Sequence, residues 1–177
     1  MPRAKRPPPR LQRPWQPLRG NHDLTPGVFG REFGALNRTV ICAGWKLLLV
    51  DSNPGDNPPL AAEQLDWIRE QLKATDANTP LVLCTHHPLM PHTKSSLLAG
   101  ADQVLALCKE HNLKAALAGH YHGNQEEIAD GVLFTTTACL STTRSNFDGS
   151  PAKGYRLFHC RNGEIVTEFV PVQERDR

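Results

Sequence analysis

The feature that most constrains this chain is a pair of short apolar segments separated by a predicted helix. Residues Leu81–Cys84 and Ala115–Ala118 are almost entirely apolar, which is typical of strands buried on both faces of a sheet. Between them, apolar residues recur at helical spacing, so we expect a helix over residues 98–111. This order of strand, helix and strand predicts an α/β fold.

The rest of the chain fits the same fold class and becomes richer in strands toward its C-terminal end. Apolar residues at helical spacing predict a second amphipathic helix over residues 60–73. Asp130-Gly131 and Asn162-Gly163 predict two β-hairpin turns. The further predicted strands are Thr39–Ala43, Lys46–Asp51, Glu127–Ala129, Val132–Thr137, Tyr155–Cys160 and Ile165–Val170.

Histidines directly follow both of the buried apolar segments. His86 and His87 come after the first segment, and His120 and His122 come after the second. Because ligands of open α/β sheets bind beyond the carboxyl ends of the strands, we expect these four imidazoles to face one crevice. Neutral imidazole is the commonest side-chain metal ligand and suits zinc, iron, manganese or nickel. The two motifs at matching strand ends therefore predict a metal site, which a single His-x-His would not.

A third polar motif, Gly20-Asn21-His22-Asp23, lies near the start of the chain. The Asn21 carboxamide offers an oxygen to a metal ion, and His22 can donate a proton. Asp23 can hold the imidazole in position, as in other His–Asp pairs. The alternative is a Gly-Asn turn whose neighbours are incidental.

In this order, Gly-Asn-His-Asp, His-His-Pro and Gly-His-Tyr-His resemble the motifs of the calcineurin-like metallophosphoesterases, and in particular the branch with the class III cyclic-nucleotide phosphodiesterases. The resemblance covers Gly20 to about Val170. It implies a four-layer α/β/β/α sandwich, in which helices flank two mixed sheets and a two-metal centre lies between the sheets.

The resemblance also implies a role for each matched residue. Asn21, His86 and His120 match ligands of one metal ion, and His122 matches a ligand of the other. His22 matches the residue that stabilises or protonates the leaving group, and Asp23 lies behind it. The implied reaction is hydrolysis of a phosphoester by a hydroxide that divalent ions (iron, manganese or zinc) activate.

The sequence departs from the family pattern at its beginning. Family members carry Asp-x-His and Gly-Asp motifs upstream of Gly-Asn-His-Asp, and these complete the first metal site and bridge the two ions. Here only 19 residues precede Gly20, none of them is acidic or His, and no Asp-x-His occurs anywhere. We therefore interpret residues 20–177 as an N-terminally truncated phosphoesterase domain that lacks the strands bearing those motifs. It is expected to bind at most one ion tightly, with low or absent turnover.

Two classes of function remain open at this point. One is a metal-dependent hydrolase of phosphoester bonds, of the phosphodiesterase or phosphatase type. The other is a non-catalytic remnant that binds a metal ion or a partner only. Arg144, in a polar loop, and His87 are weaker candidates for substrate binding; the alternative for Arg144 is a plain solvated loop.

Composition bears on the first 19 residues and on the compartment. Residues 1–19 hold six Lys or Arg, six Pro and no acidic residue, so we expect a disordered segment, with binding of nucleic acid or of a polyproline-binding partner as the functional alternative. The remainder holds 14 basic and 18 acidic residues, so no specific nucleic-acid binding is expected. With no signal peptide and no apolar run long enough to span a membrane, we expect a cytoplasmic protein with a small-molecule substrate.

Overall fold

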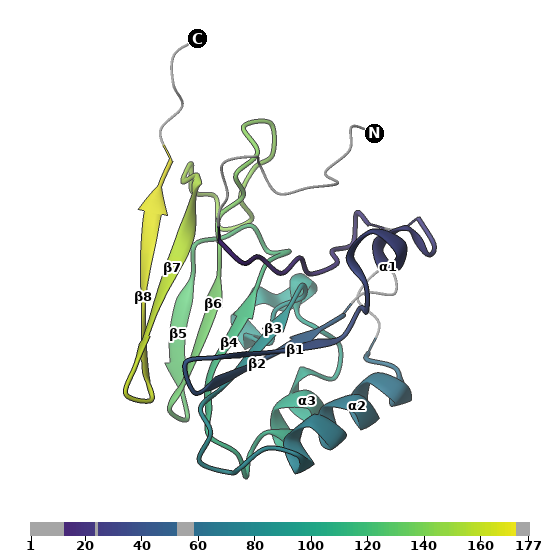
Figure 1. Cartoon of the computed structure of the whole chain (residues 1–177). Coiled ribbons are helices and arrows are strands. Elements are labelled where there is room, and N and C mark those ends of the chain that lie inside the picture. The colour runs from purple at the N-terminus through teal and green to yellow at the C-terminus, as the bar shows by residue number, and fades with distance from the viewer. Residues whose placement is uncertain (1–12, 24, 53–58, 173–177) are drawn as a thin grey trace.

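Six strands form one mixed sheet, and two further strands form a second, smaller sheet (Figure 1). The computed structural model describes residues 13–23, 25–52 and 59–172, so most of the basic N-terminal segment lies outside the described residues. The strands of the larger sheet are β1 (Arg38–Cys42), β2 (Trp45–Val50), β3 (Leu81–Thr85), β4 (Leu113–Ala118), β5 (Glu126–Ala129) and β6 (Val132–Thr136). The smaller sheet consists of β7 (Gly154–Arg161) and β8 (Glu164–Pro171).

The order of strands in the larger sheet is β1-β2-β3-β4-β6-β5. Strands β2, β3, β4 and β6 run parallel, while β1 and β5 pair antiparallel at the two edges. The predicted strands are all confirmed, with ends that shift by one or two residues. Since β3 and β4 are parallel neighbours, their carboxyl ends meet at the same edge of the sheet.

The two predicted hairpin turns are also confirmed. Asp130 and Gly131 have φ values of 51° and 77°, and they connect β5 to β6. Asn162 and Gly163 have φ values of 51° and 75°, and they connect β7 to β8. Two consecutive residues with positive φ match the turn whose twist suits a tight antiparallel pair.

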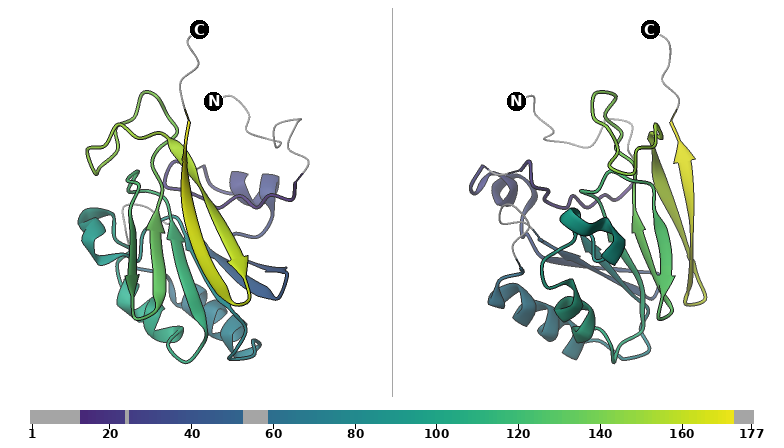
Figure 2. Two further views of the ribbon diagram at one scale, coloured as in Figure 1. Left: turned by 90° about the vertical axis from the view of Figure 1, so that its left-hand side faces the viewer. Right: turned by 180° about the vertical axis from the view of Figure 1, so that it is seen from behind.

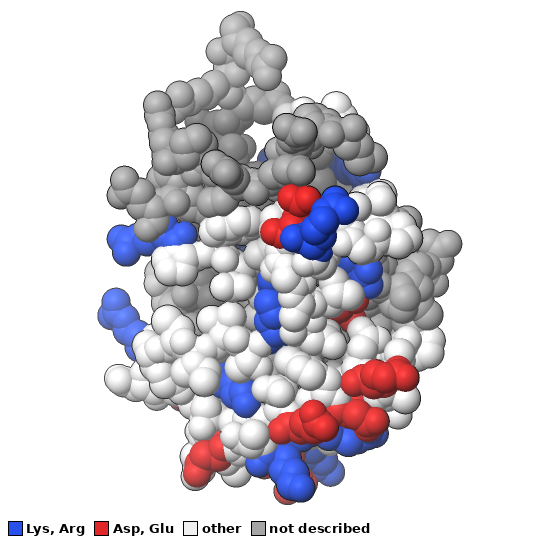
Figure 3. Space-filling model, turned by 45° about the vertical axis from the view of Figure 1, so that its right-hand side comes forward, with Lys and Arg blue, Asp and Glu red and all other residues white. Residues whose placement is uncertain are grey.

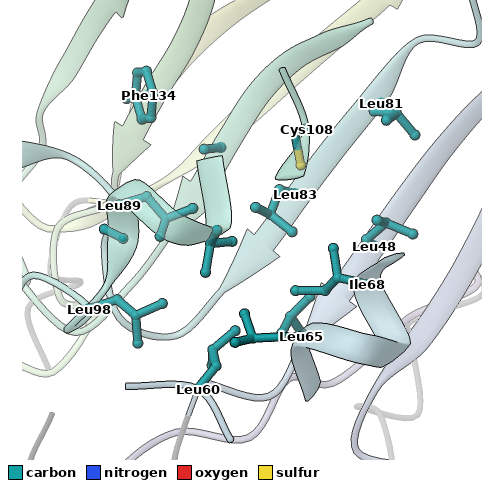
Figure 4. Close-up of a cluster of buried hydrophobic side chains, with 14 of the residues drawn as sticks. Leu48, Leu60, Leu65, Ile68, Leu81, Leu83, Leu89, Leu98, Cys108 and Phe134 are labelled. Carbon is teal, nitrogen blue, oxygen red and sulfur yellow. The ribbon is translucent and has the colours of Figure 1, made fainter. Parts of the chain in front are cut away.

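Helices α2 (Ala62–Lys73) and α3 (Ala101–Leu107) lie against one face of the large sheet, and the β7–β8 hairpin lies against the other (Figure 2). The main core joins the helices to the sheet through residues such as Ile68 and Leu83, each at most 1% exposed (Figure 4). On the opposite face Trp45, Val82, Ala115 and Leu133 pack with residues of the hairpin. The sheet is thus buried on both faces where its strands are parallel, as the apolar segments predict.

The helices differ from the predictions at their ends. Helix α3 is shorter than the predicted span 98–111, because Gly100 precedes it with a left-handed φ of 73° and the chain turns after Cys108. Two short elements, α1 (Val28–Phe33) and the 3-10 helix η1 (Pro91–Ser96), were not predicted. Each has six residues, which is too few to establish a helical period in the sequence.

The predicted fold class, a mixed α/β structure with two sheets, is confirmed. Within the described residues the layers are helices, the six-stranded sheet and the hairpin. The outer helical layer beyond the hairpin, which the four-layer resemblance implies, is not among them. On the face shown in Figure 3, acidic and basic side chains are interspersed, and the part described there has no continuous basic surface. In the described part of the chain, no helix combines the length and the apolar character needed to cross a membrane.

Candidate metal centre

The two histidine motifs lie side by side at the carboxyl ends of β3 and β4. The ladder between these strands ends at the pair Thr85 and Ala118. One further bond follows, in which the N–H of Gly119 donates to the carbonyl of His86 at 3.1 Å. The predicted convergence of the imidazoles is therefore a consequence of the parallel pairing of two buried strands.

Three of the imidazole rings form a compact cluster. The ring centroids of His86 and His120 are 5.0 Å apart, those of His87 and His120 are 4.4 Å apart, and those of His86 and His87 are 5.1 Å apart. His122 stands at the side of this cluster, where its ring stacks on Phe147 at 5.4 Å. His122 is thus the one of the four whose ring contacts the loop after β6.

The third motif reaches the same cluster from a segment far away in sequence. The Nε2 atom of His86 lies 3.0 Å from Oδ1 of Asn21, in hydrogen-bonding contact. The backbone of Gly20 passes so close to the His86 ring that a Cβ at Gly20 would lie 2.9 Å from Cε1. The structure therefore brings together Asn21, His86 and His120, which the family resemblance implies as ligands of one metal ion.

The Gly-Asn-His-Asp segment is attached to the end of β2 by a charged pair. Arg19 donates from Nε to Oδ1 of Asp51 at 3.0 Å and from Nη2 to Oδ2 at 2.5 Å. The Asp51 side chain is 4% exposed, and such a two-point guanidinium–carboxylate pair fixes orientation as well as distance. Asp23 closes the motif as a turn, because its Oδ2 accepts from the N–H of Gly20 at 2.9 Å. Support of the His22 ring by Asp23 stays a prediction.

Ser52 connects β2 to the His-His-Pro turn. Its hydroxyl oxygen accepts from the N–H groups of His86 and His87 at 3.0 and 2.9 Å, and it lies 3.1 Å from Nδ1 of His87. His87 is 1% exposed. A ring this deeply buried packs beneath the neighbouring ligands and has no direct route to solvent. The burial therefore speaks against the weaker prediction that His87 binds substrate.

The electrostatic environment keeps the clustered imidazoles neutral. Burial, followed by the neighbouring histidines His120, His87, His122 and His22, lowers the pKa of His86 to about 3. Burial and three of its histidine neighbours lower the pKa of His120 to about 4. Burial also lowers the pKa of His122, and the positive charges of Arg144 and Lys153 act in the same direction. Neutral imidazole is the form that binds a metal ion.

Two of the predicted ligands have unusual backbone conformations. His120 has φ 59° and His122 has φ 54°. Non-glycine residues with positive φ are uncommon, and each is expected to cost about 1–3 kcal/mol unless the surroundings hold it. Such conformations cluster at functional sites, and both of these lie in the Gly-His-Tyr-His turn.

The donor atoms at the cluster suit one divalent metal ion. An amide oxygen and two neutral imidazoles meet at Asn21, His86 and His120, and this is a donor chemistry that divalent transition metals accept. In the described ranges, however, no group of three or more His, Cys, Asp or Glu side chains is arranged to hold an ion. The residues thus fit one ion with Asn21 as a ligand. No acidic side chain has been found to complete a second site among the residues described.

His22 and Arg144 meet at the open side of the cluster. The Nη1 atom of Arg144 donates to Nε2 of His22 at 3.0 Å, although the two residues are 122 positions apart in the chain. Both side chains are exposed. The exposed edge of the site therefore consists of the predicted leaving-group residue and the predicted substrate-binding arginine.

Fold and site together define a mixed α/β protein with a cluster of histidines at the carboxyl ends of two parallel strands. The fold is similar to the crystal structure of a dimetal phosphatase from Danio rerio, with a TM-score of 0.51 and 18% identity. The match covers 66% of this chain and 36% of that chain, and at this identity it bears on the fold alone. No curated protein matches the chain.

The family model of the calcineurin-like phosphoesterases matches residues 3–124. The chain belongs to this family, as the three motifs predict. All three motifs lie inside the matched range, which also includes most of the basic N-terminal segment. Neither comparison specifies the cyclic-nucleotide branch.

Sequence reasoning missed the residues that support the ligands. Arg19 donates to Asp51 from 32 positions away, and Ser52 accepts from His86 and His87 from 34 and 35 positions away. No spacing or periodicity in the sequence connects residues so far apart. The available signal was the polar pair Asp51-Ser52 at the end of an apolar strand, because polar groups at that position face the ligand-binding edge of the sheet.

Proposed function

We propose that the Asn–His cluster binds a divalent metal ion and serves the hydrolysis of phosphoester bonds, of the phosphodiesterase or phosphatase type. The observation that carries this proposal is the convergence of Asn21, His86 and His120, all neutral donors, at the carboxyl ends of parallel strands. Membership of the calcineurin-like phosphoesterase family supports the reaction class.

In this proposal Asn21, His86 and His120 hold one ion, and His122 is a ligand available to a second. A bound divalent ion supplies a neutralising charge for the phosphoryl oxygens and lowers the pKa of the attacking water. His22 lies at the exposed edge, where its ring can give a proton to the departing oxygen. Arg144 lies beside it at 3.0 Å and offers a guanidinium to the bound phosphate.

A second candidate function is metal binding without catalysis. It is favoured by the finding that no group of three or more His, Cys, Asp or Glu is arranged around an ion in the part of the chain that the structure describes. Two-metal hydrolysis needs two ions about 3.5–4 Å apart, so that both the attacking and the leaving oxygen are stabilised. A single-ion site supplies only part of this stabilisation and would turn over more slowly than a two-metal site.

The two functions are separated by one set of measurements on the full 177-residue chain. The metal-free protein is titrated with Mn²⁺ and Zn²⁺ by calorimetry, and the loaded protein is assayed with p-nitrophenyl phosphate and bis(p-nitrophenyl) phosphate. The hydrolase proposal expects release of p-nitrophenol that a chelator stops and that His86→Ala abolishes. The matched control is His159→Ala, because His159 is an exposed histidine of β7 far in sequence from the three motifs.

Each outcome decides between the candidates. Chelator-sensitive turnover that survives in His159→Ala and is lost in His86→Ala supports the hydrolase. Tight metal binding with no turnover of either ester supports metal binding without catalysis. Failure of the wild-type chain to bind either metal, with a normal thermal unfolding transition, contradicts both.

A further inference from the structure

A polar pocket opens beside His22 in the loop between β6 and β7. It has a volume of about 450 Å³ and is lined by residues of the segment 142–153. The charged side chains that line it are Arg144 and Lys153, and the remaining polar lining includes the hydroxyl residues Thr142, Thr143 and Ser150. The pocket therefore presents two positive charges and several hydroxyl groups.

The two cations are coupled to each other and to the metal centre. The Nζ atom of Lys153 donates to the backbone carbonyl of Arg144, and both residues line the same pocket. Arg144 in turn donates to Nε2 of His22 at 3.0 Å. Arg144 therefore links the pocket to His22, the predicted leaving-group residue.

The loop that carries the pocket is held in place by a buried amide. Asn146 is 5% exposed, and its Oδ1 accepts from the N–H of Cys139 at 3.0 Å. Its Nδ2 donates to the carbonyls of Ser150 at 2.9 Å and Ala152 at 2.6 Å. These bonds clamp both ends of the loop, so the pocket is formed before any ligand arrives, which reduces the entropic cost of binding.

The acidic residue of the loop does not neutralise the cations. Asp148 turns its carboxylate to backbone N–H groups: Oδ1 accepts from Ser150 at 2.9 Å and Oδ2 from Asn124 at 2.9 Å. It is not among the residues that line the pocket. The positive charge of Arg144 and Lys153 is therefore available to an incoming anion.

We propose that this pocket is an anion-binding subsite, which takes a second oxyanion group, a phosphate or a carboxylate, carried on the leaving-group side of the phosphoester substrate. The assignment of a substrate rests on the proposed function, whereas binding of the anion does not. Guanidinium forms charge-assisted bonds to oxyanions that are about twice as strong as neutral hydrogen bonds. Arg144 is therefore expected to exchange its bond to the His22 ring for one to the anion.

The binding test uses the metal-free full chain, so that it is independent of hydrolysis. Inorganic phosphate and acetate are titrated separately while backbone amide resonances are followed by NMR. We expect phosphate to shift resonances of residues 142–153, and the double variant Arg144→Gln/Lys153→Gln to bind it at least about 10-fold more weakly, since two charge-assisted contacts are lost. Arg161→Gln, which removes an exposed cation of β7, is the matched control and is expected to bind phosphate as the wild type does.

A kinetic test then measures whether the subsite contributes to substrate affinity. With the metal-loaded chain, p-nitrophenyl phosphate is compared with an analogue that bears a second phosphate on the leaving group. The subsite predicts that Lys153→Gln raises KM for the analogue and leaves KM for the simple ester nearly unchanged, because Lys153 lines the pocket and, unlike Arg144, is given no part in binding the phosphoester itself. Stronger binding of acetate than of phosphate would assign the subsite to a carboxylate.

The failures of the two proposals are distinguishable. Phosphate binding at residues 142–153 without any turnover leaves the subsite in place and contradicts the hydrolase. Unchanged phosphate affinity in a folded Arg144→Gln/Lys153→Gln variant, whose thermal unfolding matches that of the wild type, overturns the subsite whether or not the chain is a hydrolase.

Discussion

At the scale of single residues, the site depends on how closely backbone and ring can approach. Gly20 has no Cβ, and a Cβ there would lie 2.9 Å from Cε1 and 3.1 Å from Nδ1 of His86. Carbon atoms at such a distance repel strongly, so one of the two groups has to move. The glycine therefore sets the position of the Asn21 oxygen relative to the His86 ring.

Gly20→Ala is expected to weaken Mn²⁺ binding at least about 10-fold, because supporting groups of metal ligands commonly contribute 10–100-fold to affinity. The free energy of unfolding is expected to fall by about 1–3 kcal/mol, since the added methyl overpacks the site. Calorimetric metal titration and urea unfolding measure the two effects. Gly30→Ala is the control, because a Cβ at Gly30 in α1 meets nothing within 4 Å; equal metal affinity in the two variants would contradict the steric explanation.

The ligands themselves could be predicted from the sequence, but their conformations could not. His86 and His120 follow apolar strands directly, and this local pattern places them at one edge of the sheet. The positive φ values of His120 and His122 have no such signal, because the sequence there contains no Asn or Gly at those two positions to suggest a left-handed backbone. Strain of this kind is a result of the tertiary structure around the site.

At the scale of elements, local chemistry predicted strands and turns better than helix ends and attachments. The strands and the two hairpins have signals within a few residues, such as Asp130-Gly131. Helix α2 begins at Ala62, two residues after the start of the predicted span 60–73. The Gln64 side chain accepts from the N–H of Ala61 and donates to the carbonyl of Asp51. The N-terminal end of helix α2 is therefore also attached to the end of β2, and the spacing of residues along the chain does not reveal this contact.

The attachment of the segment 19–23 to β2 leads to a prediction about Arg19. Arg19→Gln leaves the Asp51 carboxylate, 4% exposed, without its two-point partner. Breaking a buried ion pair costs about 3–5 kcal/mol, and because the Arg19 side chain is 22% exposed we expect about 2–3 kcal/mol here, with weaker Mn²⁺ binding. Arg69→Gln, which breaks the exposed pair with Asp66, is the control and is expected to change stability by less than about 1 kcal/mol.

Urea unfolding and metal titration of both variants give the comparison. The additional variant Asp51→Asn in the Arg19→Gln background removes the uncompensated charge and is expected to recover part of the stability without recovering metal affinity. If Arg19→Gln binds Mn²⁺ as tightly as the wild type, the pair does not position the Gly-Asn-His-Asp segment.

The loop between β6 and β7 contributes a pH dependence through Asp148. Burial alone would raise the pKa of Asp148, but the N–H groups of Ser150 and Asn124 and the side chains of Ser150 and Gln125 outweigh it and lower the pKa. A carboxylate with a lowered pKa adds stability above its ordinary titration range, and this is lost as pH falls through the lowered value. We expect the free energy of unfolding to fall below about pH 4, and Asp148→Asn to reduce that fall.

Urea unfolding between pH 7 and pH 3 measures this dependence. Asp130→Asn is the matched control, since Asp130 lies in an exposed hairpin turn. An equal slope of stability against pH in the wild type and in Asp148→Asn would show that the backbone bonds to Asp148 do not stabilise the folded loop.

At the scale of the whole molecule, the sequence predicts which residues are buried but not the order of the strands. Apolar runs without alternation indicate strands covered on both faces, and the structure has helices on one face and the β7–β8 hairpin on the other. The order β1-β2-β3-β4-β6-β5 is determined by contacts between strands that are far apart in the sequence. The contact of His22 with Arg144 is long-range in the same way, so local sequence patterns predict neither.

The last prediction concerns the number of metal ions that the molecule holds. Asn21, His86 and His120 form one donor set, whereas among the described residues no group of three or more His, Cys, Asp or Glu side chains forms a second set around His122. Because a pair of ions needs a bridging carboxylate to stay about 3.5–4 Å apart, we expect about one Mn²⁺ per chain after chelation and reloading, measured by elemental analysis and calorimetry. His86→Ala is expected to abolish this binding, and His122→Ala to weaken it far less. A stoichiometry of two, with two affinities and a loss of only one of them in His122→Ala, would mean that residues not yet assigned complete a second site.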